Sequence, residues 1–457
     1  MTLIETMIAA MTAVVNCRTH LISAPLLQPI AIGCIMAANL GHLLKPGARK
    51  FDCSTEYIRR LIKERGWRCV KPQGDSRKLP KGWESLRWKM VLRLAYFVCV
   101  HEIPHELVIN ADHTGIMFHQ VKGKMWITKE QAKANDKAVR NDGDKRQFTL
   151  LATTSAAGET LKHQIVVSGK STASLPKYPR NQYVTTRAGV NTKGKMSICA
   201  KLRFAVKELA NIGSFCVTDN HWSDNITSYG YITDVAVPYF KEKIDALHKQ
   251  GKCKEFGKQV SVLIIDCWWG WLDAEFRGWL RKEHNWLRLI FVPGACTPVA
   301  QPMDAGVIAK IKGKLRGLYS KWVMNLTQAQ LVSGIDADKI FIPADVGSCK
   351  KNLFKWLCEV ADVMNTDKAG VKHCWEKTDL LRAWDRSVWV EAVASADNLF
   401  NSTVGQVVRA DRIEDNADTE DPDAGHPGEP FLATNNLEEA EEYMQFCNWD
   451  EQVGADA

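Results

Sequence analysis

The sequence predicts an α/β protein in which helices flank a central mixed β-sheet, preceded by an all-helical N-terminal region. Short apolar runs at 106–110, 147–168, 260–266 and 287–294 have the length and composition of strands. Segments with apolar residues at helical spacing alternate with the later runs. Strand hairpins that lead into alternating strands and helices are typical of a mixed sheet covered by helices.

Residues 1–70 have a helical pattern, and 51–67 form one predicted helix that begins at Ser54, a favourable N-cap residue. Its apolar positions recur at helical spacing, at Tyr57, Ile58, Leu61 and Ile62. The other faces are basic, which suits either a DNA-recognition helix or an ordinary amphipathic helix with a basic solvent face. We expect DNA contacts from the four basic residues, which are Arg59, Arg60, Lys63 and Arg65.

A basic connector at 71–89 leads into a buried helix at 87–102 and a short strand at 106–110. Two strands around a turn at Gly158 follow, and then an amphipathic helix at 229–250. The chain continues with a strand at 260–266, a helix at 272–284, a strand at 287–294 and a long basic helix at 303–323. We therefore expect one domain over 90–330, a helical extension over 331–410 and an acidic tail over 411–457.

The charge is distributed unevenly along the chain. Residues 411–457 contain fifteen acidic residues and one Arg, which predicts a disordered tail. Residues 1–410 then carry a net charge of +22. Such a charge favours a polyanionic partner such as nucleic acid, although a solvated basic surface without a particular partner fits equally well.

Fourteen cysteines are scattered without a CxxC pair, and the N-terminus lacks a basic n-region. These features signal neither a disulfide framework nor a zinc ribbon, and they predict a reducing, intracellular location. Residues 21–40 carry no charge, which meets the length rule for a membrane span, but two prolines, Gln28 and Asn39 interrupt them. We expect no membrane partner.

The run His101-Glu102-Ile103-Pro104-His105 spells HExxH, the zinc-protease motif. That motif requires both histidines on one unbroken helix. A proline in a helix interior costs about 3 kcal/mol or more, so Pro104 disfavours the required geometry. We expect instead a helix that ends before Pro104, followed by a loop into the next strand.

Three aspartates stand at predicted element ends. Asp112 follows one apolar run, Asp266 ends another, and Asp304 lies two residues after Pro302, in the first turn of the basic helix. Each of them singly is explained as a cap or turn residue. Together, three converging carboxylates would form a hard oxygen site for Mg²⁺ or Mn²⁺.

The order of these motifs resembles the DDE superfamily endonuclease domain of pogo-like transposases, in the mariner superfamily. The resemblance runs from about residue 50 to 400 and rests on LVINADHTG, DKRQFTLLATTSAAGETL, HWSDNITSYGYITDVAVPYF, LIIDCWWGWLDAEFRGWL and FVPGACTPVAQPMDAGVIAKIK. It implies an RNase H-like fold preceded by a helix-turn-helix region that binds DNA. It also implies two Mg²⁺ or Mn²⁺ ions held by Asp112, Asp266 and Asp304, with 37 residues between the last two.

The resemblance further implies phosphodiester hydrolysis and strand transfer on double-stranded DNA, at transposon terminal repeats and at target DNA. A nuclear location and a homodimer are expected on the same basis. Basic residues after Asp304 would hold phosphates near the metals, although a solvated helix face explains many such residues. These residues are Lys310, Lys312, Lys314 and Arg316.

Two features depart from the family pattern. Cys267 and Trp271 stand where the family often has Asn and His, and the helical region before the connector is short. Residues around a metal site can change metal affinity or activity by about 10 to 100-fold. Two hypotheses therefore stay open: an active transposase, or a catalytically weakened or inactive, transposase-derived DNA-binding protein.

Overall fold

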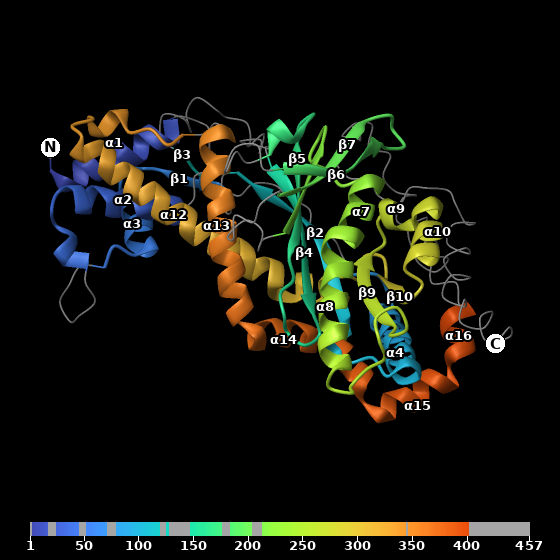
Figure 1. The fold of residues 1–457 in the computed structure, drawn as a ribbon. Coiled ribbons are helices and arrows are strands. Elements are labelled where there is room, and N and C mark those ends of the chain that lie inside the picture. Colours follow the sequence, from blue (N-terminus) through green and yellow to red (C-terminus); the bar gives the residue numbers. More distant parts are fainter. Residues whose placement is uncertain are drawn as a thin grey trace, which may run out of the picture. The chain divides into compact units, whose positions relative to one another are not determined.

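The computed structural model describes residues 2–16, 24–44, 52–70, 79–118, 125–127, 147–175, 183–202, 213–343 and 346–401 (Figure 1). The chain divides into two compact units. The first unit comprises Met1–Ser76, Ile116–Gln147 and Ile311–Val360, and the second comprises Arg77–Gly115, Phe148–Lys310 and Ala361–Ala457. The domain boundaries expected from the sequence stay predictions, and the acidic tail at 411–457 lies outside the described residues.

The first unit is mainly helical. Its N-terminal elements are α1 (Leu3–Asn16), α2 (Ala24–Ala37), the short η1 (Gly41–Leu44) and α3 (Thr55–Glu64), and β1 (Arg68–Val70) pairs with β3 (Met125–Ile127). It also includes η6 (Ala337–Lys339) and parts of α12 (Ile308–Val332) and α13 (Val346–Thr366). Apolar side chains of α1 and α2 are buried, and a Cβ on Gly33 would lie 2.7 Å from the Met324 carbonyl oxygen. That close approach explains why a residue without a side chain stands there.

The charge-free stretch at 21–40 contains α2, a helix of 14 residues. Leu27, Ile30 and Ala31 of α2 are completely buried, so its apolar residues contribute to the core of the first unit. Among the described residues, no helix combines the length and the apolar composition that a transmembrane crossing needs.

Helix α3 confirms the helix predicted from Ser54. The Ser54 side chain accepts a hydrogen bond of 3.2 Å from the Tyr57 backbone N–H, and Ile58, Leu61 and Ile62 are buried. The four basic residues predicted to contact DNA are all exposed. A helix-turn-helix arrangement is not shown among the described residues, so the DNA-contacting role of α3 stays a prediction.

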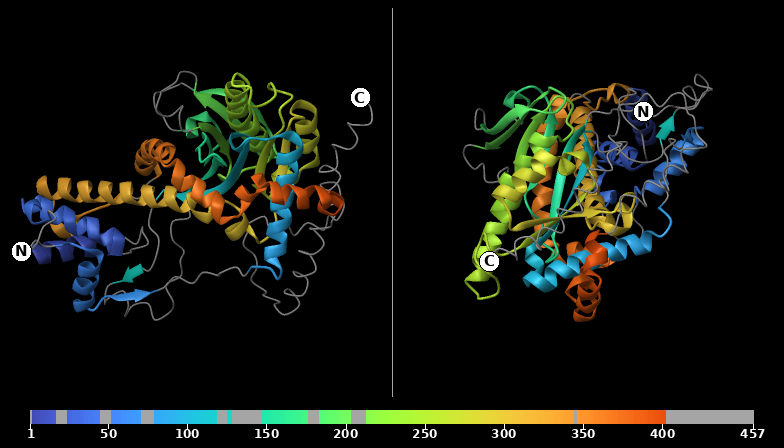
Figure 2. Two further views of the ribbon diagram at one scale, coloured as in Figure 1. Left: turned by 90° about the horizontal axis from the view of Figure 1, so that it is seen from below. Right: turned by 90° about the vertical axis from the view of Figure 1, so that its right-hand side faces the viewer.

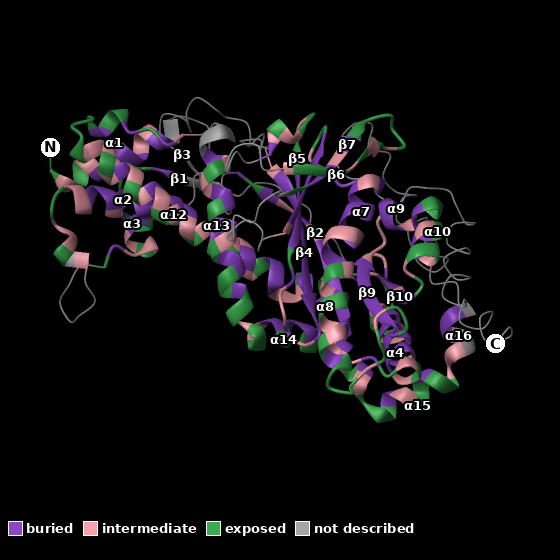
Figure 3. Cartoon of the chain, viewed as in Figure 1, coloured by how far each residue is buried: buried purple, intermediate pink, exposed green. Residues whose placement is uncertain are grey.

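The second unit is built on an eight-stranded sheet with the strand order β10-β9-β2-β4-β5-β8-β7-β6. In chain order the strands are β2 (Val108–Met117), β4 (Gln147–Ser155), β5 (His163–Ser168), β6 (Tyr183–Val190), β7 (Met196–Leu202), β8 (Gly213–Thr218), β9 (Ser261–Asp266) and β10 (Leu287–Val292). The central residues of β4, β5, β8, β9 and β10 are almost fully buried (Figure 3), whereas the edge strand β6 is largely exposed. This strand order brings β2 and β9, which lie far apart in the sequence, side by side.

The directions of the strands make the sheet mixed. Strand β9 runs parallel to both β2 and β10, and β5 runs parallel to β8, whereas β4–β5, β6–β7 and β7–β8 pair antiparallel. The Ala156 N–H donates to the Val108 carbonyl at 2.9 Å, so the end of β4 lies beside the start of β2. Strands β2, β5, β8, β9 and β10 therefore share one direction, and their carboxyl ends lie at one edge of the sheet.

Helices cover both faces of this sheet (Figure 2). The helices of the second unit are α4 (Trp83–His101), α7 (Asn225–Tyr231), η4 (Ile232–Ala236), α8 (Val237–His248), α9 (Trp269–Leu272), α10 (Ala274–Glu283), α11 (Thr297–Ala300), η5 (Met303–Val307), α14 (Lys368–Lys377), η7 (Leu380–Trp384), α15 (Arg386–Ala394) and α16 (Ala396–Asn401), with the short η2 (His105–Leu107) and η3 (Thr172–Ser174) in connections. Of these, α15 and α16 pack on α4. The α/β prediction is confirmed. The architecture is consistent with an RNase H-like fold.

The expected helix end before Pro104 is confirmed. Helix α4 ends at His101, and Glu102 caps it in a left-handed conformation with φ of 51°. His105 lies beyond the proline in η2, where its ring stacks on Trp384 with a centroid distance of 4.0 Å. The two histidines of the HExxH run therefore belong to different elements, which excludes the zinc-protease geometry.

The short strand expected at 106–110 is longer in the structure, because β2 continues to Met117. Asp112 therefore lies inside the strand, and the prediction that it stands at the end of its element was wrong. Asp112 and Thr114 are polar yet buried, with exposed fractions of 9% and 8%. In the sequence, a buried polar residue such as Asp112 interrupts an apolar run just as the end of a strand does. The two cases cannot be distinguished from the apolar pattern alone.

Candidate active site

The register of the sheet places Asp112 beside Asp266. Strands β2 and β9 are parallel, and Asn110 is paired with Ile264. Two residues further along both strands are Asp112 and Asp266, which therefore lie at corresponding positions and on the same face. Two acids separated by 153 residues in the sequence are neighbours across one pair of strands.

Asn110 links the elements that carry all three acids. Its Nδ2 donates to the Ile264 carbonyl at 3.0 Å, and its Oδ1 accepts from the Met303 N–H at 3.0 Å. Ile264 lies two residues before Asp266, and Met303 directly precedes Asp304. The Asn110 side chain is completely buried, so both hydrogen bonds are shielded from water. Sequence reasoning did not single out this residue.

Asp304 lies in η5, at the beginning of the basic helix. Pro302 is its N-cap residue, and the Asp304 N–H donates to the Gln301 carbonyl at 3.1 Å. The hydroxyl of Thr154, on β4, contacts the Met303 sulfur at 3.6 Å and further fixes this turn to the sheet. Asp304 is exposed and Asp266 is half-buried, so the side of the site formed by Asp304 is open to solvent.

The charges of Asp304 and Asp266 both act on the buried carboxyl of Asp112. The pKa of Asp112 is raised well above its usual value, first because the side chain is buried, then because of the negative charges of Asp304 and Asp266. Burial and like charges both disfavour the ionised form. The fold therefore gathers the three acids predicted from the sequence, at a cost in electrostatic free energy.

Gln301 supplies an amide group next to the acids. Its side chain lies close enough to the Asp112 carboxyl to act against the rise in the pKa of that group. Gln301 is completely buried, and neither amide atom makes a hydrogen bond of standard geometry to the described residues. A buried amide without such bonds is costly, and a bound ligand or water would satisfy it.

These residues fit a divalent cation in donor chemistry and in charge. Carboxylate oxygens are the ligands that Mg²⁺ and Mn²⁺ prefer, and a cation would offset the repulsion that raises the pKa of Asp112. Within the described ranges, however, no three Asp, Glu, His or Cys side chains converge closely enough to form a ready ligand set.

The two positions that depart from the family pattern are accommodated by packing. The Cys267 N–H donates to Asp266 Oδ1 at 2.8 Å, and its thiol donates to the Val292 carbonyl at 3.2 Å. Trp271 is 1% exposed and its ring stacks against His113, with 6.0 Å between the centroids. Burial lowers the pKa of His113 to about 4, so this imidazole is neutral at neutral pH. Trp271 and His113 belong to an aromatic cluster that also includes Trp268.

The basic residues predicted after Asp304 differ in environment. Lys310, in the second unit, forms an ion pair of 2.8 Å with Asp367 and is about one-third exposed. Lys312, Lys314 and Arg316 belong to the first unit, where Lys314 is exposed and the other two are half-buried. Their contacts with DNA stay predictions.

No protein-family model and no curated protein matches the sequence. Similar solved structures include a pre-cleavage Mos1 transpososome, with 11% identity, 69% of this chain and 71% of that chain covered, and a TM-score of 0.26. A Mos1 transposase paired-end complex with left transposon end has 10% identity, coverage of 64% and 72%, and a TM-score of 0.25. The Mos1 Strand Transfer Complex has 10% identity, coverage of 70% for both chains, and a TM-score of 0.24. Likeness at this level assigns no function.

Proposed function

We propose that this protein is a DDE-type transposase that hydrolyses DNA phosphodiester bonds and transfers the freed strand end to target DNA. The observation that carries the proposal is the convergence of Asp112, Asp266 and Asp304 on adjacent elements, with the raised pKa of Asp112 that results from it. The resemblance of the surrounding motifs to pogo-like transposases supports the same reaction.

Asp112, Asp266 and Asp304 would hold the cofactor, which we propose to be two Mg²⁺ or Mn²⁺ ions. Bound there, such ions polarise the phosphodiester and lower the pKa of an attacking water. Asp112 contributes a buried carboxyl whose pKa is raised, and because cations bind the ionised form, their binding would favour loss of the proton. Exposed Asp304 forms the side from which DNA approaches, and the Gln301 amide lies beside Asp112 to orient a bound oxygen.

The proposed partners are double-stranded DNA at transposon terminal repeats and at target sites, and a second copy of the chain. The net charge of +22 over residues 1–410 supports DNA binding through phosphate contacts. A nuclear location follows from a DNA substrate in a cell with a nucleus. The basic segments at 71–89 and 310–316 are compatible with nuclear import.

The test is nicking of supercoiled plasmid DNA by the full-length protein in Mg²⁺ or Mn²⁺. We expect nicking activity that EDTA abolishes. Asp266→Asn should lower this activity at least about 100-fold, because it removes the negative charge of one cation ligand. Asp219→Asn is the matched control, since Asp219 is an exposed acid that follows β8. Equal activity of Asp266→Asn and the wild type would overturn the proposal.

A second candidate is a transposase-derived protein that binds DNA without cutting it. The burial of Trp271 against His113, at a position where the family often has His, favours this alternative. It predicts salt-sensitive DNA binding that is independent of divalent cations, with no nicking under any condition. Loss of binding in the triple variant Arg59→Ala, Arg60→Ala, Lys63→Ala would locate the DNA-binding surface on α3.

A further inference from the structure

The hairpin formed by β6 and β7 is basic and extends the sheet beyond β8. Residues 183–202 contain no acidic residue and four basic ones, which are Arg187, Lys193, Lys195 and Lys201. Strand β6 is the last strand of the sheet, and most of its residues are exposed or half-buried. This concentration of positive charge on one projecting element needs a physical explanation.

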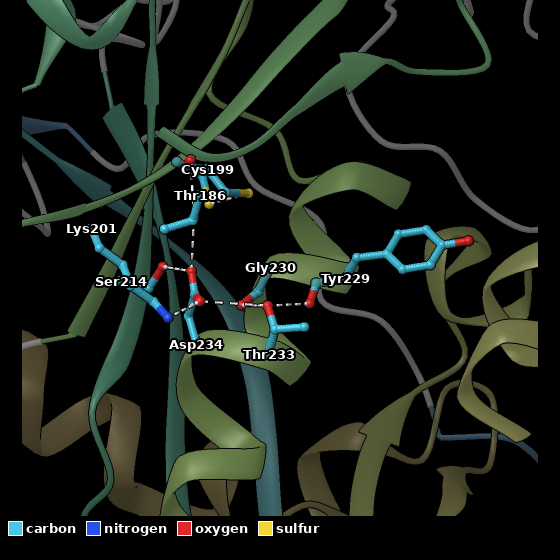
Figure 4. Close-up of polar contacts among 9 residues, drawn as sticks. Thr186, Cys199, Lys201, Ser214, Tyr229, Gly230, Thr233 and Asp234 are labelled. Carbon is cyan, nitrogen blue, oxygen red and sulfur yellow. Dashed lines mark hydrogen bonds and ion pairs between the residues drawn. The ribbon is translucent and has the colours of Figure 1, made fainter. Parts of the chain in front are cut away.

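Two of the four charges are used to anchor the hairpin. Figure 4 shows the Asp234 carboxylate on η4, which accepts from Lys201 at 2.6 Å and from Thr186 and Ser214 at 3.3 Å each. These partners lie on β7, β6 and β8, so one carboxylate with an exposed fraction of 3% holds three strands. The guanidinium of Arg187 lies 3.9 Å from the centre of the Tyr229 ring, over α7.

The turn between the two strands is held equally firmly. Asn191 Oδ1 accepts from the backbone N–H groups of Lys193 and Lys195, at 3.0 Å each. Asn191 Nδ2 donates to the Asp224 carboxylate at 3.2 Å, and the Ser197 hydroxyl donates to the same oxygen. The side chain that shapes the turn is thus itself fixed to the N-cap residue of α7.

Unlike Lys201 and Arg187, Lys193 and Lys195 do not anchor the hairpin through their charged groups. Both side chains are exposed, on either side of Gly194, which has a φ of 72° and at which an added Cβ would meet no atom within 4 Å. Among the described residues, neither ammonium group has an ion-pair partner. A preorganised turn that carries two unpaired cations binds an anion with little loss of conformational entropy.

The tip of the hairpin lies at the edge of the sheet that carries the acids. Strand β7 begins beside the end of β8, with Ile198 opposite Val217. Strand β8 runs in the direction of β9, which ends at Asp266. Four strand spacings separate β2 from β7. At about 4.8 Å each, they amount to about 19 Å.

We propose that the 191–195 tip grips the phosphate backbone of the duplex DNA whose scissile phosphate lies at the acids, an inference that rests on the proposed function. With about 3.4 Å per base pair, the contacted phosphates lie about five to six base pairs from the cut. The hairpin then aligns the duplex along the sheet edge, so that the strand to be cut crosses Asp112 and Asp266. Phosphate contacts of this kind fix register without reading sequence.

The first experiment measures binding of the full-length protein to random-sequence DNA duplexes of 8 to 40 base pairs in EDTA, over a range of salt concentrations. We compare Lys193→Ala/Lys195→Ala with Lys249→Ala/Lys252→Ala, which removes the same charge from exposed lysines between α8 and β9, at the opposite edge of the sheet. The tip variant should lower the slope of log K against log salt by about 2. The control variant should leave it unchanged.

The second experiment places single ethylated phosphates along an intact duplex whose cut position has been mapped, and it measures which of them reduce nicking. Wild-type nicking should be reduced by ethylation about five to six base pairs from the cut, and the tip variant should be insensitive at those positions only. Equal salt slopes for the tip and control variants, or identical interference patterns for the tip variant and the wild type, would overturn the inference. Absence of DNA binding by the wild-type protein would instead overturn the proposed function together with it.

Discussion

Replacing Asp112 by Asn should stabilise the cation-free protein at neutral pH. Asn has nearly the shape of a protonated Asp, and it replaces a carboxyl whose ionised form is disfavoured first by burial and then by the charges of Asp304 and Asp266. Neighbouring parallel strands are about 4.8 Å apart, and at an effective dielectric constant of about 20 this separation gives a repulsion of about 3 kcal/mol between two unit charges. This repulsion energy includes Asp266 alone, because Asp304 is exposed and solvent screens its charge.

The effect should depend on pH in a defined direction. The pKa of Asp112 is raised in the folded protein, so folding favours the protonated carboxyl. The contribution of this group to stability is complete below its usual pKa and is lost as the pH rises through the raised value. Wild-type and Asp112→Asn proteins should therefore be equally stable near pH 4 and diverge above it. The variant should melt about 5–10 °C higher at pH 8.

Thermal unfolding in EDTA and in Mg²⁺ or Mn²⁺, from pH 4 to pH 8, measures this difference. Added cations should raise the melting temperature of the wild type, increasingly at higher pH because binding displaces a proton from Asp112, and should leave Asp112→Asn unchanged. Asp219→Asn should behave as the wild type does. An Asp112→Asn protein that melts below the wild type at pH 8 in EDTA would refute the electrostatic reasoning.

Three further changes test other parts of the site. Asn110→Ala leaves the Ile264 carbonyl and the Met303 N–H unpaired, so it should lower the free energy of unfolding in urea by about 2–4 kcal/mol and abolish nicking. Normal urea stability would show that Asn110 does not link these elements. Trp271→Ala should lower the free energy of unfolding by about 3–5 kcal/mol, because it leaves a cavity where a buried side chain was packed. A decrease below about 1 kcal/mol would contradict that packing. His101→Ala should change neither nicking nor the zinc content of the purified protein, since His101 and His105 lie on different elements. Zinc lost with this variant would revive the protease hypothesis.

Local signals in the sequence predicted local structure well. The Ser54 cap, the helix before Pro104 and the hairpin around Gly158 are each decided by a few adjacent residues, and all three are present in the structure. The apolar run that ends at Asp266 is a strand buried on both faces, as its composition indicated. In these segments, propensity, capping and burial favour the same element.

The sequence did not predict the β6–β7 hairpin, and the reason is physical. Strand β6 lies at the edge of the sheet, where little apolar surface is buried, so it lacks both the apolar run of a central strand and a clear alternation. The hairpin is held by Asp224, the N-cap residue of α7, and by Asp234 on η4, both of which come later in the chain. A pattern read within a short window contains none of these partners.

The site shows the same limit, because its geometry depends on contacts between residues that are distant in the chain. The three acids could be picked out by their residue type and by the resemblance of the motifs around them, but nothing local indicates that Asn110 connects their elements. Its two hydrogen-bond partners lie 154 and 193 residues away. Since Asn110 pairs with Ile264 in the sheet and also fixes Met303, any shift of β9 or η5 breaks a buried hydrogen bond. The repulsion among the acids is thus opposed by a neutral residue that lies two positions before Asp112 on β2.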